Sequence, residues 1–223
     1  MFKKKYITKY NFLYKIYLIF FFIRYKFFIK KSSYSQFEED LTINYFFKDF
    51  VGKYVDIGCY HPIKFNNTLL LYNRGWKGVN IDLNPTSIDL FNMVRNEDLN
   101  INACLSDKEE EVTIFFDNEF SALNSIYSSN VEKFQIKNYK KIKTKTKIFS
   151  DLVKDNFDFL NIDCEGNDLK ILKSINLTIY TPKLICIEAG LENDTGAIYK
   201  YLSFNGYELL EVKKESHIFK RIK

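Results

Sequence analysis

Residues 54–85 read YVDIGCYHPIKFNNTLLLYNRGWKGVNIDLNP, and this stretch decides the fold. Its apolar runs at residues 54–57 and 79–82 predict two strands, because apolar runs of this length are typical of buried strands. The stretch between them predicts a short helix over residues 67–74, which Gly75 ends. A strand, a helix and a second strand in succession favour parallel pairing in an α/β sheet.

Two helix starts can be recognised on either side of these strands. Asn84 caps the helix that follows the second strand, and Pro85 suits its first turn because that position needs no backbone N–H. Upstream, Ser35 and Glu38 have the spacing of a capping box, which predicts a helix that begins near Ser35.

The rest of the chain continues the alternation of apolar runs and helical patterns. Helices are predicted after Gly166 and around residues 198–202. Further strands are predicted at 99–104, 112–116, 142–148, 157–162 and 184–187, and an antiparallel pair at 207–212 and 217–221. We therefore expect an α/β fold with a mostly parallel sheet of about seven strands flanked by helices.

Acidic residues fall at the ends of four predicted strands, namely Asp56, Asp82, Asp163 and Glu188. In an open parallel sheet the carboxyl ends of the strands meet along one edge, and ligands bind in the crevice beyond that edge. Four carboxyl groups at equivalent positions therefore predict a binding site for a polar, cationic or hydroxyl-rich ligand.

The spacing between Gly58 and Asp82 indicates what this crevice binds. Asp82 comes 24 residues after Gly58, close to the offset of roughly 20 residues at which an acid on the second strand meets a ribose diol. Tyr60 and His61 stand where a dinucleotide-binding fold needs glycine and phosphate contact. Their presence argues against a nicotinamide reductase and for a nucleoside cofactor without a pyrophosphate.

Several motifs in a fixed order resemble the FkbM-type methyltransferase family. They are YSQF at 34–37 with ED at 39–40, the stretch 54–85, ALNS at 122–125, FLNIDCEGNDLKIL at 159–172 and PKLICIE at 182–188. The resemblance spans about residues 34–221, and an ordered set of motifs is more specific than any one of them. The chain departs from the family at Glu38, where the family usually has glycine.

The resemblance implies a Rossmann-like class I methyltransferase sheet and S-adenosylmethionine as the methyl donor. It also implies O-methylation of a sugar, a glycan or a similar polar metabolite. Carried over onto this chain, it places Asp56 and Gly58 in the cofactor loop and Asp82 at the ribose. Glu39 and Asn124 are expected to contact the cofactor as well, and the alternative for Asn124 is a simple turn residue.

Three residues are candidates for the base that takes a proton from the acceptor. Asp163 and Glu165 resemble the family's acidic pair facing the transfer site, and His61 is the third candidate. Simpler alternatives remain open, because Glu165 could only mark a helix entry and His61 could only hydrogen-bond its own loop. Asp163, Glu165 and Asp168 could together hold a divalent cation, but the sequence does not favour a metal site.

Charge divides the 223-residue chain into a leader and a body. Residues 1–31 hold nine of the 33 Lys and Arg and none of the 28 Asp and Glu, which leaves 24 basic and 28 acidic side chains in residues 32–223. We expect a methyltransferase domain over 32–223 and, over 1–31, a basic aromatic helix that contacts a membrane surface. The alternatives for the leader are a helix packed on the domain and a segment without fixed structure.

The weakly acidic body shows no nucleic-acid footprint, so the expected partner is a small-molecule or glycan substrate. Cys59, Cys104, Cys164 and Cys186 form no CxxC pair, which predicts free thiols in a reducing compartment. We therefore expect a cytoplasmic protein that is peripheral at the inner face of the membrane. The competing hypothesis is a membrane-associated binding module that keeps the methyltransferase fold without catalysis.

Overall fold

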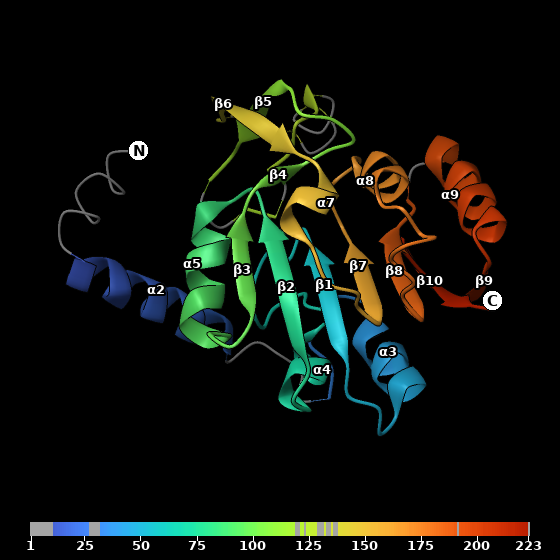
Figure 1. Ribbon diagram of the computed structural model, residues 1–223. Coiled ribbons are helices and arrows are strands. Elements are labelled where there is room, and N and C mark those ends of the chain that lie inside the picture. The colour runs from blue at the N-terminus through green and yellow to red at the C-terminus, as the bar shows by residue number, and fades with distance from the viewer. Residues whose placement is uncertain are drawn as a thin grey trace.

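The computed structural model describes residues 11–26, 32–118, 121–122, 124–128, 132, 135, 138–190 and 192–222. Within them, a twisted sheet forms the centre and helices lie against its faces (Figure 1). The helices are α2 (Asn11–Lys26), α3 (Glu39–Phe47), α4 (Leu69–Asn73), α5 (Pro85–Val94), α7 (Phe149–Leu152), α8 (Asp168–Ser174) and α9 (Glu192–Phe204). The strands are β1 (Lys53–Ile57), β2 (Lys77–Asp82), β3 (Leu99–Asn102), β4 (Cys104–Leu105), β5 (Glu111–Phe116), β6 (Lys140–Lys147), β7 (Phe159–Ile162), β8 (Leu184–Glu188), β9 (Tyr207–Lys213) and β10 (Ser216–Arg221).

Seven strands form the main sheet in the order β3-β2-β1-β7-β8-β10-β9. The neighbouring pairs from β3 to β8 are parallel, and β10 runs antiparallel to both β8 and β9. The chain builds outward from β1 to β3 and then crosses to the other side of β1. The switch point therefore lies between β1 and β7, where sheets of this kind bind ligands. The predicted parallel sheet and its closing antiparallel pair are confirmed.

Side chains of the central strands alternate between the two faces of the sheet. On β1, Val55 joins the core cluster that includes side chains of α8 and α9, whereas Tyr54 joins the cluster that includes those of α3 and α4. On β7, Leu160 and Phe159 divide in the same way. Both faces of these strands are buried, which explains why the strands read as nearly continuous apolar runs.

The strand predicted at 99–104 is two strands that belong to different sheets. Before Ala103 the chain pairs with β2, and after it the chain enters β4, which pairs with β6 in a three-stranded sheet of order β4-β6-β5. The Ala103 N–H still donates to the Asp82 carbonyl (3.0 Å), so the chain leaves the main sheet where β2 itself ends. The strands predicted at 112–116 and 142–148 are confirmed as members of this smaller sheet.

The helix predicted near Ser35 begins at Glu39 instead. Glu38, the residue before it, has a left-handed backbone (φ 68°, ψ 26°), and its side chain makes no cap hydrogen bond. The Ser35 hydroxyl pairs with Asp40, since it donates to Asp40 Oδ1 (2.8 Å) and accepts from the Asp40 backbone N–H (3.2 Å). The capping box is therefore wrong. A glycine at position 38 would have a physical reason, because glycine adopts this backbone without steric cost.

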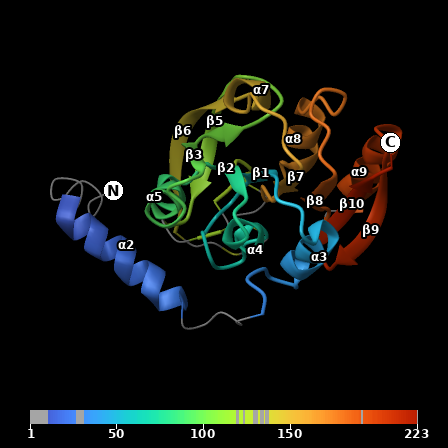
Figure 2. The same cartoon turned by 60° about the horizontal axis from the view of Figure 1, so that its bottom comes forward.

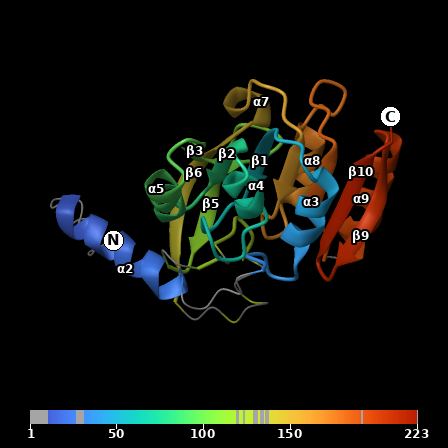
Figure 3. The same cartoon turned by 90° about the horizontal axis from the view of Figure 1, so that it is seen from below.

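The helix expected in the leader is α2, which lies at the margin of the molecule beside α5 (Figures 2 and 3). The leader prediction covered residues 1–31, and its residues 1–10 and 27–31 lie outside the described part of the chain. Among the helices that the structure describes, none has both the length and the apolar character needed to cross a membrane.

Candidate active site

A cavity of about 620 Å³, its open mouth included, lies at the carboxyl ends of β1 and β2. It coincides with the switch point of the main sheet. Apolar side chains form part of its wall, among them Ile57, Ile81, Ala103, Leu105 and Ile171. Polar residues form another part, among them Gly58, Tyr60, Asp82, Asn124, Asp163 and Glu165. We call this space the first cavity.

Asp82 ends β2 and lines the first cavity. Its Oδ2 accepts a hydrogen bond from the Tyr60 backbone N–H (2.8 Å), and its Oδ1 accepts one from the Asn84 backbone N–H (2.7 Å). Burial raises the pKa of Asp82 to about 6, although both hydrogen bonds act to lower it. At neutral pH the group is therefore mainly ionised, and each oxygen keeps a further lone pair for hydroxyl hydrogens.

Gly58 lets the loop after β1 approach the loop after β7. Its φ is 76°, and a Cβ at this position would lie 1.7 Å from the Asp163 carbonyl oxygen. The Gly58 N–H donates to the Ile81 carbonyl (2.9 Å), which holds the loop at the end of β2. Because Gly58 and Asp163 both line the first cavity, this close approach of the two loops shapes its wall.

Asp56 lies behind the wall of the first cavity, with an exposed fraction of 1%. Its carboxylate accepts hydrogen bonds from Thr68 Oγ1 (2.9 Å) and Asn161 Nδ2 (2.8 Å). Asn161 accepts in turn from Asn67 Nδ2 (2.9 Å). Burial raises the pKa of Asp56, while the Asn161 hydrogen bond acts to lower it. These contacts give Asp56 a supporting position, and its contact with a cofactor stays a prediction.

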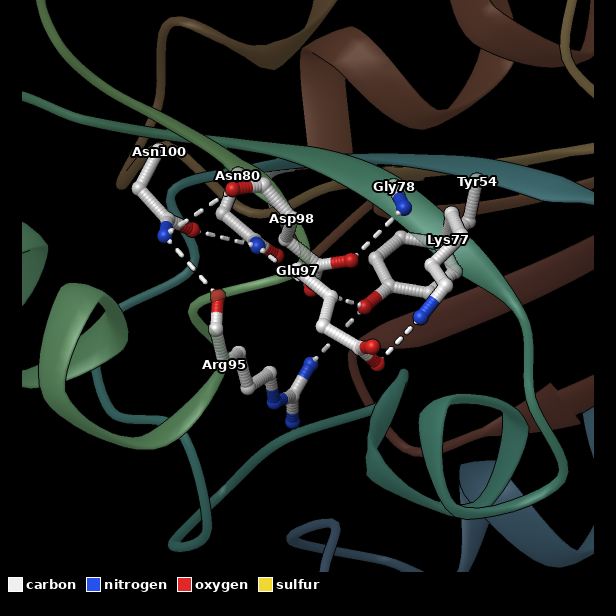
Figure 4. Close-up of polar contacts among 8 residues, drawn as sticks. All are labelled: Tyr54, Lys77, Gly78, Asn80, Arg95, Glu97, Asp98 and Asn100. Atoms are coloured by element: carbon white, nitrogen blue, oxygen red, sulfur yellow. Dashed lines mark hydrogen bonds and ion pairs between the residues drawn. The ribbon is translucent and has the colours of Figure 1, made fainter.

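Arg95 is a fully buried cation beside this network. Its guanidinium donates to Thr68 Oγ1 (2.7 Å), Asn66 Oδ1 (2.6 Å) and the Pro62 carbonyl (2.7 Å). These three bonds hold the segment that follows β1. A longer contact with the Tyr54 hydroxyl (3.4 Å) connects Arg95 to a polar cluster at the other end of the sheet (Figure 4).

Figure 4 shows this cluster toward the amino ends of β1, β2 and β3. Asp98 accepts hydrogen bonds from the Tyr54 hydroxyl, the Gly78 N–H (2.8 Å) and Asn80 Nδ2 (3.0 Å). Asn80 also donates to Asn100 Oδ1 (2.8 Å). A Cβ on Gly78 would lie 2.0 Å from the Tyr54 ring, so glycine is what allows the ring to reach Asp98. The cluster ties the three strands together at the end opposite the first cavity.

A second cavity of about 990 Å³, its open mouth included, shares Ala122, Asp163 and Glu165 with the first. Five carboxyl side chains line it, namely Glu39, Asp163, Glu165, Glu188 and Glu215. Among the described residues that line it there is no Lys or Arg. Its wall is therefore negatively charged and rich in hydrogen-bond acceptors.

Asp163 follows β7 directly and lies where the two cavities meet. Burial raises the pKa of Asp163 well above its ordinary value, and the carboxylates of Glu188 and Asp168 raise it further. By surface area Asp163 is an exposed residue, but this surface faces the two cavities, so protein and like charges still surround the carboxyl group. An ionised Asp163 is therefore a stronger base than an ordinary aspartate.

The turn between β7 and α8 positions Glu165. Glu165 and Gly166 both have a positive φ, 51° and 97° respectively. The Asp168 carboxylate accepts from the backbone N–H groups of Cys164 (2.7 Å) and Gly166 (3.0 Å), and burial raises the pKa of Asp168 to about 6. Because α8 begins at Asp168, Glu165 precedes the helix and lines both cavities. Among the described residues, no group of three or more His, Cys, Asp or Glu side chains could hold a metal ion.

Two residues expected at the cofactor have other surroundings. Glu39 is buried, accepts a hydrogen bond from the Phe37 N–H (2.7 Å) and lines the second cavity rather than the first. Asn124 lines the first cavity, but its side chain accepts from the Asp117 N–H (2.9 Å) and donates to two carbonyls of its own loop (both 3.1 Å). These contacts favour the turn role for Asn124, and cofactor contact by either residue stays a prediction.

His61 lines neither cavity. Its Nδ1 accepts hydrogen bonds from the backbone N–H groups of Ile63 (3.1 Å) and Lys64 (3.0 Å). Burial lowers the pKa of His61 to about 3, and the charge of Lys64 acts in the same direction, so the ring is neutral at neutral pH. The ring also packs edge-on against Phe21 of α2, with 5.5 Å between the centroids. These contacts favour a loop-holding role over that of a base.

The family model of the methyltransferase FkbM domain matches residues 56–209, which is more than half of the 223-residue chain. The chain belongs to the FkbM methyltransferase family. The resemblance seen in the sequence is thereby confirmed, and with it S-adenosylmethionine as the cofactor of the family, whereas methyl transfer by this chain stays a prediction. No curated protein sequence matches the chain.

Solved structures similar to this FkbM-family chain include methyltransferase FkbM from Methylobacillus flagellatus KT, with 14% identity and a TM-score of 0.49. The match covers 76% of this chain and 43% of that protein, so the chain spans less than half of that protein's length. A TehB-like SAM-dependent methyltransferase from Corynebacterium glutamicum has 15% identity and a TM-score of 0.48, over 82% of this chain and 86% of that one. The 16S rRNA methylase ArmA has 13% identity and a TM-score of 0.40, over 82% of each chain. At these identities and scores, no acceptor carries over from these proteins.

The first cavity fits the nucleoside donor of an FkbM methyltransferase. A carboxylate with unused lone pairs, Asp82, stands at the end of β2, where a ribose is expected. Gly58 lets the loop after β1 meet the loop after β7, and both loops line this cavity. Ile81 and Leu105 supply apolar surface for the nucleobase of the cofactor. These residues suit a nucleoside without a pyrophosphate, which is the kind of cofactor that the sequence predicts.

The sequence marks Glu188 as a strand-end acid without giving it a specific role, and the structure places it in the second cavity. Two further features of the FkbM-family site are not predicted from the sequence. Glu215 lies in the turn between β9 and β10, where no sequence pattern marks it. Arg95 follows α5 and reads as an ordinary cation at a helix end, so its complete burial has no sequence signature.

Proposed function

We propose that the chain transfers a methyl group from S-adenosylmethionine to a hydroxyl oxygen of a sugar, a glycan or a similar polar metabolite. The observation that carries this proposal is the meeting of the two cavities at Asp163 and Glu165. With the donor in the first cavity and the acceptor in the second, the transfer point lies beside two carboxylates. Such groups are suited to take the proton that the acceptor hydroxyl loses.

On the donor side, bound S-adenosylmethionine supplies a methyl group that its sulfonium has already activated. The chain's own task is to bind and orient this molecule. In the proposal, Asp82 accepts hydrogen bonds from the ribose hydroxyls, which form a charge-assisted pair with a carboxylate. Gly58 allows the loops after β1 and β7 to meet beside the donor, and Ile81 contributes apolar surface.

On the acceptor side, the charge of the second cavity favours a ligand rich in hydroxyl donors. Ionised carboxylates only accept hydrogen bonds, and a sugar presents many O–H donors. The described lining contains no Lys or Arg to bind phosphate, which argues against a nucleic-acid acceptor. An amine acceptor would also suit negative charge, so the experiment below distinguishes it.

For the proton transfer, Asp163 is the proposed base and Glu165 the proposed partner in orienting the hydroxyl. Burial and the neighbouring carboxylates raise the pKa of Asp163, which strengthens it as a base. Its position at the junction lets it face the acceptor oxygen at the point of transfer. His61 is not needed in this scheme, because it lines neither cavity.

Binding of the donor's demethylated product, S-adenosylhomocysteine, tests the donor site. We expect Asp82→Asn to weaken binding about tenfold in calorimetry, because a charge-assisted pair to the ribose is lost. Asp155→Asn is the control, since Asp155 is exposed and pairs only with the exposed Lys53 among its described contacts. If Asp82→Asn keeps its melting temperature and binds the product as tightly as the wild type, the donor site is wrong.

Transfer of a labelled methyl group tests the acceptor class. The protein is incubated with S-adenosylmethionine carrying a radioactive methyl and with a polysaccharide extract, a bulk RNA or a mixture of polyamines. We expect label in the polysaccharide that survives mild alkali, because a methyl ether resists the base that cleaves a methyl ester. Label only in RNA or in amines would contradict the proposal.

A further inference from the structure

α2 is attached to the domain by one side only. On this inner side, Leu18 and Phe21 are buried with Leu90 of α5. The Tyr14 hydroxyl also donates to the carboxylate of Asp89 on α5. These contacts fix the rotation of the helix about its own axis, and so determine which of its residues face outward.

The outer side of α2 consists of large apolar side chains, namely Phe12, Leu13, Ile16, Ile19, Phe20 and Ile23. Their exposed fractions lie between 45% and 73%. At 3.6 residues per turn, the six fall within an arc of about 120°. A helix at a water-facing surface carries polar residues on this side, and one that is apolar all round is typically buried on every side. The outer side of α2 therefore suits an apolar environment that the domain does not provide.

The charge of the leader indicates the kind of surface that supplies this environment. Residues 1–31 hold nine Lys and Arg and no acid. An anionic lipid surface attracts such a segment, and each basic residue near it adds to the attraction. Lys15 is exposed within α2 itself. A lysine next to a membrane-facing apolar side can extend its ammonium group toward the lipid headgroups. Residues 32–223 have an excess of only four acids over bases, so a second copy offers a weaker charge match.

We infer that α2 lies in the plane of an anionic lipid surface, with its outer side in the boundary between headgroups and acyl chains. The inner side then holds the methyltransferase domain against that surface through α5. Basic residues supply the long-range attraction, and the apolar side chains supply the burial that keeps the helix there.

Cosedimentation with vesicles tests this inference on the full chain. The vesicles contain equal parts of phosphatidylglycerol and phosphatidylcholine, or phosphatidylcholine alone. We expect wild-type binding to the anionic vesicles, and about tenfold weaker binding for the double variant Ile16→Ser/Phe20→Ser because it removes two inserted side chains. Phe204→Ser is the matched control, since Phe204 is 90% exposed on α9 and should bind like the wild type. High salt should weaken the wild-type binding.

A fluorescent variant gives a second readout that removes no apolar side chain. Phe20→Trp places a reporter on the outer side, while the native Trp76 is fully buried and gives a constant background. We expect its emission to shift to shorter wavelength when anionic vesicles are added, and not with Phe204→Trp.

Three results would overturn the inference. Wild-type protein that stays in solution with anionic vesicles is one, and equal binding by the double variant is another. The third is a wild-type dimer in sedimentation velocity that the double variant dissociates while vesicle binding is unchanged. That result would make the outer side an interface between copies of the chain.

Discussion

Asp82 and Asp163 are both carboxyls in cavity walls, but their surroundings differ. Two backbone N–H groups donate to Asp82, which partly offsets the effect of burial on its pKa. Asp163 has the carboxylates of Glu188, Asp168 and Glu165 nearby, and these add to the effect of burial. The two environments separate the pKa values, a pattern that often separates a binding role from an acid–base role. Asp82 thus suits binding, and Asp163 suits proton transfer.

The proposed base predicts a pH-dependent rate. Because the pKa of Asp163 is raised, the group remains protonated to a higher pH than an ordinary aspartate and can act only above that pKa. We expect kcat to rise with pH through this pKa and to fall about 100-fold in Asp163→Asn, while donor affinity changes little. A pH–rate profile and product-binding calorimetry measure both. An Asp163→Asn variant with the wild-type profile would exclude this role.

Arg95 predicts a large effect on stability at a single residue. Arg95→Met leaves the buried acceptors Asn66 Oδ1 and the Pro62 carbonyl without their donor, and it removes a cation near the buried Asp56. We expect the free energy of unfolding to fall by about 3–5 kcal/mol in urea denaturation. Lys77→Met is the control and should cost less than about 1 kcal/mol, because Lys77 pairs with Glu97 at the surface. A loss in Arg95→Met no larger than in the control would contradict this account.

At the scale of elements, local patterns locate strands better than they locate helix starts. The helix at Asn84 starts as predicted, since its side chain accepts from the Thr86 N–H (3.0 Å) within the same turn. The helix after Ser35 does not, because the Ser35 hydroxyl oxygen accepts from the backbone N–H of Asp40 rather than from that of Glu38, three residues on. The Asp40 carboxylate accepts hydrogen bonds from Ser33, Tyr34 and Ser35, which hold this segment outside the helix. A cap pattern therefore predicts a start only where the hydroxyl oxygen accepts from the backbone N–H three residues on.

The backbone at Glu38 predicts a stabilising substitution in the element that begins there. A side chain in the left-handed region costs about 1–2 kcal/mol, and Glu38 has φ 68° at the start of α3. Part of the gain from Glu38→Gly is lost because glycine leaves the unfolded chain more freedom. We expect a net rise of about 0.5–1 kcal/mol in the free energy of unfolding. Glu38→Ala keeps the Cβ and should give no such rise, and equal effects of both variants would refute the backbone explanation.

At the scale of the whole molecule, the leader helix and the domain meet at His61. Phe21 of α2 packs on its ring, and two backbone N–H groups of the loop donate to its Nδ1. The folded protein therefore holds this imidazole neutral, with its pKa lowered to about 3. Below a pH of about 6.5 the unfolded chain takes up a proton at this position and the folded chain does not.

This difference predicts a loss of stability with acid. The unfolded state binds more protons than the folded state between pH values of about 6.5 and 3, so the free energy of unfolding falls as the pH falls through this window. Relative to His61→Gln, which does not titrate there, we expect the wild type to lose about 2 kcal/mol between pH 7 and pH 5. Urea denaturation of the wild type and of His61→Gln at both pH values measures this difference. The titration of His217 and of the carboxyl groups is common to both proteins and cancels. A constant difference would show that His61 titrates alike in both states.

The sequence by itself determined the order of strands and helices, the parallel sheet and the family. These follow from periodicity, from glycine and proline at helix ends and from ordered motifs, all of which are local in the chain. It also predicts that Asp82, Asp163 and Glu165 lie along the edge formed by the carboxyl ends of the strands, because parallel strands end on the same side of a sheet.

Only the tertiary structure decided what each of these side chains faces. The chain folds Asp56 into a buried network with Arg95 and keeps His61 out of both cavities, although the sequence predicts Asp56 and His61 at the site. It also brings Glu215 into the second cavity, and no sequence pattern marks Glu215 or the burial of Arg95. It also decides which side of α2 the domain covers. The physical reason is that burial, like-charge contacts and hydrogen-bond partners depend on residues far apart in the chain, whereas strand and helix preferences depend on neighbours.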